Sequence, residues 1–113
     1  MGEIIENTSK TVTKQFFGML GLAKRAGKTV HGTDMICEQM RAKRKPVLVF
    51  VSQYASDATR KRLRTKSSFY EIPLYEISAT TEELGHILSG GGLTAAVAIV
   101  DDGFAARLLT ECM

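Results

Sequence analysis

The spacing of apolar residues in the first part of the chain predicts two helices with a short strand between them. Apolar side chains recur at intervals of three or four residues, as on one face of a helix, at Val12, Phe16, Leu20 and Ala23. Gly27 ends this helix. A short strand is predicted at residues 29–31. A second helix begins at Thr33 or Asp34, whose short polar side chains can cap free backbone donors, and Pro46 stops it.

Three apolar segments predict buried strands farther along the chain. Residues 47–51 form an uninterrupted run of β-formers, the pattern of a strand that is covered on both faces. Residues 72–77 and 95–100 are the other two segments. Their starts lie about 25 residues apart with a helical segment between each pair, which is the rhythm of βαβ units. The predicted fold is therefore α/β, a three-layer α/β/α sandwich.

Short polar motifs predict where the remaining helices begin. Ser56 and Asp57 open a third helix, whose basic body over residues 60–64 we interpret as a solvated face. Residues 80–83 have the form of a capping box. The adjacent Asp101 and Asp102 are interpreted as a cap for the last helix. The glycines at 90–92 precede the third strand and predict a pliable loop that lets the backbone approach something closely.

The length of 113 residues predicts one domain over residues 10–113, preceded by a flexible N-terminal end at residues 1–9. The longest apolar runs are too short to span a bilayer, and the first fifteen residues lack a signal-peptide pattern. We therefore expect a cytoplasmic protein.

Charge is distributed unevenly along the chain. Residues 10–66 carry fourteen lysines and arginines against three acids, whereas residues 67–113 carry one arginine against seven acids. A compact chain with this polarity presents a basic surface, which points to a polyanionic partner because each cation that neutralises a phosphate releases counterions. The alternative is a solvated charged surface with no partner.

The side chains that most often catalyse reactions form no known arrangement here. His31 and His86 have no cysteine or serine partner in a nucleophile motif. Cys37 and Cys112 have no metal-binding spacing, so we interpret them as reduced thiols. The triple glycine lacks the residues of a phosphate loop. We predict no catalysis, no metal site and no cofactor.

The better candidate for a binding site is the basic turn at residues 27–34, which leads directly into a helix N-terminus. Free N–H donors and the positive end of the helix dipole favour a phosphate, and Thr33 and Asp34 can hydrogen-bond a base edge. Gly32 leaves room for a nucleic acid to approach. The alternative is an ordinary capped helix start.

Several short motifs, in order over residues 13–110, resemble the bacterial YlxQ branch of the L-seven-Ae ribosomal protein family. They are LGLAKRAGK at 20–28, Gly32, the strand at 47–51, Ala55-Ser56 with its basic helix, Tyr70 and Pro73, Glu83-Leu84-Gly85, and Asp102-Gly103-Phe104-Ala105. The resemblance implies a four-stranded mixed sheet, counting the short strand at 29–31. It also implies binding of structured RNA, typically a kink-turn or a related bulge, and a ribosome-associated role.

The resemblance further implies that RNA is held by two segments of the chain. These are the turn and start of the second helix (Lys28, His31, Gly32, Thr33 and Asp34) and the later loop (Gly91, Gly92, Leu93 and Thr94), in which Leu93 packs on a splayed-out base. Phosphate contacts independent of sequence are expected from Lys24, Arg25, Lys28, Arg41, Lys43, Arg44 and Lys45. For the basic helix at residues 60–64, the alternative to a solvated face is a contact with a second RNA segment.

The chain departs from the family's kink-turn signature, which reads Gly-Thr-Asn-Glu-x-Thr-Lys. Asp34 stands in place of the asparagine, Met35 in place of the glutamate that reads guanine edges, and Glu38 in place of a lysine near phosphates. General RNA binding is thus favoured over kink-turn specificity. The alternative is a protein–protein adaptor that has kept the fold and lost specific RNA recognition. A third hypothesis, a nucleotide-handling enzyme, requires a phosphate loop that the sequence lacks.

Overall fold

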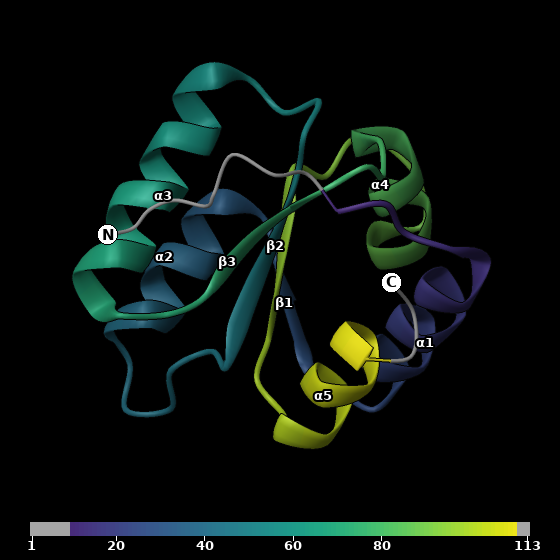
Figure 1. Cartoon of the computed structure of the whole chain (residues 1–113), viewed down its shortest axis with the longest axis horizontal. Helices are drawn as coiled ribbons and strands as arrows, with labels where there is room; N and C mark the ends of the chain where they lie inside the picture. Colours follow the sequence, from purple (N-terminus) through teal and green to yellow (C-terminus); the bar gives the residue numbers. More distant parts are fainter. Residues whose placement is uncertain (1–9, 111–113) are drawn as a thin grey trace.

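The computed structural model describes residues 10–110, in which helices and strands alternate along the chain (Figure 1). In order they are α1 (Lys14–Arg25), β1 (Thr29–His31), α2 (Thr33–Arg41), β2 (Leu48–Ser52), α3 (Asp57–Tyr70), β3 (Leu74–Ile77), α4 (Thr81–Ser89), β4 (Ala96–Ile99) and α5 (Asp102–Thr110). The predictions for residues 1–9 and for Cys112 lie outside the described residues. Cys37 is buried in α2 and unbridged.

The strands form one mixed sheet in the order β1-β4-β2-β3. Strands β2 and β3 pair in parallel through the crossover helix α3, whereas β4 runs antiparallel to both of its neighbours, β1 and β2. The expected mixed sheet of four strands is confirmed. Since β4 lies between β1 and β2, the start of α2 is placed beside the end of the loop that precedes β4.

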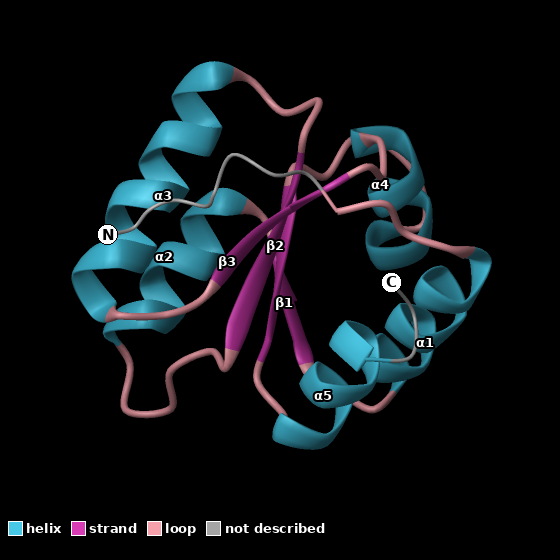
Figure 2. Ribbon diagram, in the orientation of Figure 1, coloured by secondary structure: helices cyan, strands magenta, loops and turns pink. Residues whose placement is uncertain are grey.

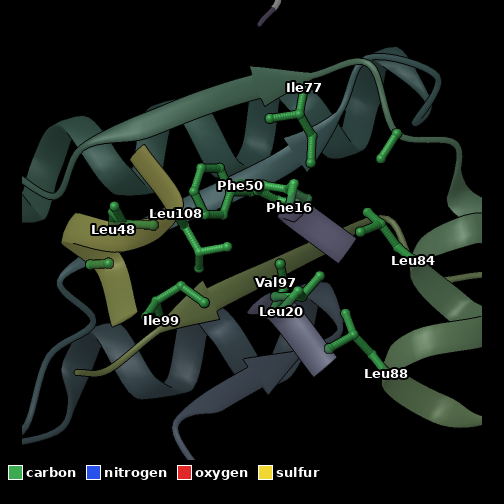
Figure 3. Close-up of a cluster of buried hydrophobic side chains, with 12 residues drawn as sticks. Phe16, Leu20, Leu48, Phe50, Ile77, Leu84, Leu88, Val97, Ile99 and Leu108 are labelled. Atoms are coloured by element: carbon green, nitrogen blue, oxygen red, sulfur yellow. The ribbon is translucent and has the colours of Figure 1, made fainter. Parts of the chain in front are cut away.

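Helices cover both faces of this sheet, so the predicted α/β/α sandwich is confirmed (Figure 2). All five residues of β2 are buried, as the apolar run predicts, and its side chains alternate between two cores. Leu48 and Phe50 pack with α1, α4 and α5 (Figure 3). Val49 and Val51 pack with α2 and α3 on the other face.

The helix starts in the second half follow the sequence motifs. Thr80 and Glu83 form the predicted capping box, in which each side chain accepts a hydrogen bond from the other residue's backbone N–H. The Ser56 side chain caps α3, and Asp101 Oδ2 accepts the N–H of Phe104 at 3.0 Å. These caps form because short polar side chains replace the missing backbone acceptors at a helix start.

The start of α2 at Thr33 is as predicted, but its cap and its end differ from the prediction. Its N-cap is Gly32, which has no side chain to cap the helix. Asp34 is the second residue of the helix, past the capping position, and its carboxylate is engaged by Arg62 of α3. The helix also ends at Arg41, so the cations at residues 43–45 lie in the following loop and not on the helix itself.

Among residues 10–110, no helix is long and apolar enough to cross a membrane.

Candidate nucleic-acid interface

The two segments expected to hold RNA meet at one end of the sheet. Because β1 and β4 are antiparallel, His31 at the end of β1 lies opposite Val97 near the start of β4. The N–H of Gly32 then donates to the carbonyl of Ala96 at 3.3 Å. The start of α2 and the loop at residues 90–95 are therefore neighbours, although about 60 residues of sequence separate them.

Gly32 sits at a backbone position that suits glycine. Its φ of 93° and ψ of 133° lie in a region that residues with a Cβ rarely adopt. The carbonyl of Gly32 begins α2 by accepting the N–H of Ile36 at 2.9 Å. Since Gly32 has no side chain with which to cap this helix, its first-turn N–H groups and the positive end of its dipole are left, among the described residues, to an anion.

The glycine loop after α4 is held against that helix. All three glycines have positive φ, and the N–H of Gly91 donates to the carbonyl of Gly85 at 3.1 Å. A Cβ added at Gly85 would lie 2.1 Å from the carbonyl oxygen of Gly92. The glycines therefore allow the loop to approach the backbone of α4 closely.

Two large apolar side chains are exposed at this end of the sheet. Leu93 is 73% exposed and Met35, in the first turn of α2, is 58% exposed. Either can pack on an unstacked base without any change in the core. Thr94, by contrast, is 5% exposed, and its N–H donates to the carbonyl of Thr81 at 3.0 Å. Its side chain is therefore not accessible to a partner, contrary to the expectation for Thr94.

An ion pair supports the start of α2. Nη1 of Arg62 lies 2.7 Å from Oδ1 of Asp34, and this hydrogen bond raises the pKa of Arg62 above its ordinary value. The arginine offsets the negative charge of Asp34 close to where a phosphate would approach. Sequence reasoning placed Arg62 on a solvated helix face, since nothing in the sequence pairs two residues 28 positions apart.

The basic side chains predicted as phosphate contacts lie elsewhere. Lys28 is at the opposite end of β1, where its carbonyl accepts the N–H of Val100 at 3.0 Å. Lys24 and Arg25 line an open hollow between α1 and α4. Arg41 and Lys45 lie at the far end of α2, roughly 13 Å from its start for a helix of nine residues. The structure thus groups residues 31–34 with 91–93 and separates both from these cations.

The basic body of α3 lies largely on an exposed face, as predicted, and two of its arginines also pair with an acid of the sheet. Arg60 pairs with Asp57 and lies 3.6 Å from Glu76, and Arg64 lies 3.1 Å from the same glutamate. Glu76 belongs to the edge strand β3, so these pairs tie α3 to the sheet. Lys61 remains exposed. No group of three histidine, cysteine or acidic side chains within residues 10–110 is placed to hold a metal ion.

Comparisons with known proteins identify the family of the chain. The sequence profile of the ribosomal protein L7Ae/L30e/S12e/Gadd45 family matches residues 14–109. The chain is 37% identical over 89 residues to the RNA-binding protein YlxQ of Enterococcus faecium, covering 79% of this chain and 82% of the relative. It is 33% identical over 96 residues to the RNA-binding protein YlxQ of Bacillus subtilis, covering 85% of this chain and 93% of the relative.

Solved structures share the fold. A Bacillus halodurans protein of unknown function superposes with a TM-score of 0.76 and 26% identity, over 86% of this chain and 95% of that one. The 15.5kD RNA binding protein of Giardia lamblia superposes with a TM-score of 0.68 over 86% of this chain and 84% of that one. Its 14% identity makes this a likeness of fold alone.

Proposed function

The chain belongs to the ribosomal protein L7Ae/L30e/S12e/Gadd45 family, and we propose that it binds structured RNA at the end of the sheet where α2 begins. The interface consists of residues 31–34 and 91–93, with Met35 beside them. One observation carries the proposal: the hydrogen bond from Gly32 to Ala96 joins an uncapped helix start to a fixed loop that exposes Leu93.

Each part of the interface offers a different contact to RNA. The first turn of α2 supplies N–H donors for a phosphate. Leu93 supplies an apolar surface for a base that is splayed out of a bulge or a kink-turn, and Gly32 leaves space for the backbone to approach. Single-stranded loops and bulges fit this surface better than a regular duplex, whose bases remain stacked.

Base specificity is expected to be lower than in relatives with the full kink-turn signature. Met35 has no group that can hydrogen-bond a guanine edge, and Asp34 is occupied by Arg62. General affinity comes instead from Lys24 and Arg25 of α1, from Arg41 of α2 and from the cations of the loop after α2. We propose that the protein acts in the cytoplasm by binding and not by catalysis, and that its RNA belongs to ribosomal particles.

A second function is supported by the exposure of Met35 and Leu93 at one end of the sheet. Two exposed apolar side chains also suit a protein–protein adaptor. Nuclease treatment distinguishes the two functions, because a protein partner stays bound after the treatment and an RNA partner does not.

The proposal is tested by gel-shift titration against a kink-turn RNA, a plain duplex and total ribosomal RNA, each at two salt concentrations. The variant Leu93→Ala removes the exposed apolar side chain of the loop. The matched control is Leu22→Ala, which truncates a 46%-exposed leucine on α1. We expect Leu93→Ala to weaken kink-turn binding at the higher salt by about fivefold or more, and Leu22→Ala to leave it unchanged.

If the unaltered protein binds all three RNAs equally and loses this binding at the higher salt concentration, the proposal of a structured-RNA site is overturned. Equal affinity of the two leucine variants would show that Leu93 is not part of the interface. In either case a nuclease-resistant partner would favour the adaptor.

A further inference from the structure

A second surface with the chemistry of an RNA contact runs along the border between α2 and α3. On α3, Arg62, Lys66 and Phe69 follow at intervals of four and three residues, which places them on one face of the helix. The ion pair between Arg62 and Asp34 shows that this face borders α2. Figure 1 shows the two helices side by side on the same face of the sheet.

The C-terminal ends of both helices lie at the same end of this border. Nζ of Lys45, just beyond α2, lies 5.2 Å from the ring centroid of Tyr70, the last residue of α3. Arg41 is seven residues after Asp34, two helical turns along the same side of α2. Cations from two helices and one loop therefore surround the end of α3.

Phe69 is the most exposed large apolar side chain among residues 10–110, at 76% of its surface. Its ring meets that of Tyr70 edge-on, with centroids 4.9 Å apart and planes at 89°. Tyr70 is half-buried and in turn contacts Lys45. The exposed ring is thus supported from one side and has its own surface open to solvent. No part of the core requires a phenylalanine there.

The loop that carries the cations is held in position. Lys45 Nζ donates to the carbonyl of Met40 at 3.0 Å, and the side chain of Gln39 donates to the carbonyl of Arg44 at 2.6 Å. Arg44 in turn reaches the carbonyl of Val100, 3.4 Å away. Fixed cations lose less side-chain entropy on binding than free ones, which favours a defined contact with phosphates.

The positive charge of this surface is not neutralised within the described part of the chain. In contrast to Arg60, Arg62 and Arg64, no acid among residues 10–110 forms an ion pair with the cations Arg41, Lys43, Arg44, Lys45 and Lys66. Unpaired cations beside an exposed aromatic ring are the combination by which proteins bind single-stranded nucleic acid, where phosphates meet the cations and a base stacks on the ring.

We propose that the α2–α3 surface, defined by Arg41, Lys45, Lys66 and Phe69, binds a single-stranded RNA segment with one unpaired base stacked on Phe69. This inference extends the proposed function, since Arg62 and Asp34 connect the surface to the start of α2. The segment is an unpaired extension of the folded RNA held at the first site.

The first experiment detects stacking directly. The chain contains no tryptophan, so Phe69→Trp introduces a single tryptophan at the surface, whose emission is excited selectively over that of the tyrosines. The matched control is Leu22→Trp on α1, across the sheet. Both variants are titrated at low salt with a single-stranded oligouridylate and with a plain RNA duplex. We expect the oligouridylate to quench the fluorescence of Phe69→Trp strongly and the duplex to quench it weakly, while neither RNA quenches Leu22→Trp.

The second experiment separates this surface from the first site. A kink-turn RNA is prepared with and without an unpaired extension, and affinities are measured for Phe69→Ala, Lys66→Ala and the control Lys14→Ala on α1. Phe69→Ala should weaken binding of the extended RNA by about fivefold to a hundredfold. Binding of the RNA without an extension should stay unchanged for all three variants. Lys14→Ala should match the unaltered protein on both RNAs.

The outcomes distinguish failure of each proposal. Absence of quenching by the oligouridylate, or equal quenching by the duplex, overturns the inference even if the kink-turn binds tightly. Quenching of the Phe69→Trp variant together with a failure to bind the kink-turn RNA supports the α2–α3 surface and contradicts the proposed first site. If Phe69→Ala lowers the affinity for both RNAs equally, the inference is overturned, because the substitution would then act by destabilising the fold. A lower thermal midpoint of the variant would confirm that cause.

Discussion

The guanidinium of Arg62 and the carboxylate of Asp34 lie 2.7 Å apart and join α3 to the first turn of α2. Both side chains are largely exposed, so the pair adds little to the stability of the fold. Its effect is on charge, because an acid at the start of α2 would otherwise repel a phosphate. The pair therefore lies between the proposed interface at the start of α2 and the proposed α2–α3 surface.

Replacing Asp34 with asparagine should raise RNA affinity. Asp34→Asn keeps an acceptor, gains an amide donor and releases Arg62, and we expect kink-turn binding about fivefold tighter, the effect of one added hydrogen bond. The thermal midpoint should not change. The control Asp57→Asn removes an equally exposed acid at the start of α3. If both variants tighten binding equally in gel shifts, the effect is one of net charge alone.

Replacing Met35 with glutamate should restore discrimination between RNAs. Met35 is 58% exposed, so Met35→Glu puts no charge into the core. A glutamate there can accept hydrogen bonds from a guanine edge, and we expect the preference for a kink-turn over a duplex to rise about tenfold. Competition gel shifts measure the ratio. Leu22→Glu on α1 provides the same charge change, and an equal rise there would contradict the assignment.

Gly85 is predicted to be necessary for the position of the loop at residues 90–94. Gly85→Ala sets a methyl group against the backbone of Gly92, so we expect a loss of about 1–3 kcal/mol in the free energy of unfolding and weaker RNA binding. Gly18→Ala is the control, because its Cβ would meet nothing within 4 Å in α1. That variant should gain about 0.5–1 kcal/mol. Urea unfolding tests both, and equal stabilities would refute the steric argument.

The capping box of α4 gives a stability prediction independent of RNA. Thr80→Ala removes the acceptor for the N–H of Glu83, 3.0 Å away, and should lower the free energy of unfolding by about 0.5–2 kcal/mol. Thr65→Ala, at an exposed position within α3, is the control and should be neutral or slightly stabilising. A loss as large in Thr65→Ala as in Thr80→Ala would show that the cap is not the cause.

Much of the fold could be predicted from local sequence. The apolar run at residues 47–51 predicted a strand buried on both faces, and β2 is such a strand. The capping box at Thr80 and the cap at Ser56 were predicted from short motifs, because a helix start is stabilised by residues three positions away. The sequence also identified Gly32 and the glycine loop as parts of one candidate site, through the family resemblance.

Other features depended on which elements pack together. The end of β1 meets the start of β4 only because β4 lies between β1 and β2 in the sheet. The same packing gave Asp34 an arginine partner on α3, and it brought Lys45 against the ring of Tyr70. No local pattern encodes these outcomes, since each depends on a contact between residues that are distant in sequence.

The sequence by itself therefore determined the order of helices and strands, the two fully buried strands β2 and β4, three of the helix caps and the excess of positive charge in residues 10–66. The third strand predicted to be buried, β3, lies at the edge of the sheet and is only partly buried. Tertiary structure decided which cations are neutralised by acids. It also decided that Phe69 lies exposed beside the ring of Tyr70, which Lys45 contacts from another segment. The physical reason is the distance along the sequence over which each interaction acts. Hydrophobic periodicity and capping act within a few residues, whereas a binding surface forms where packing brings distant segments together.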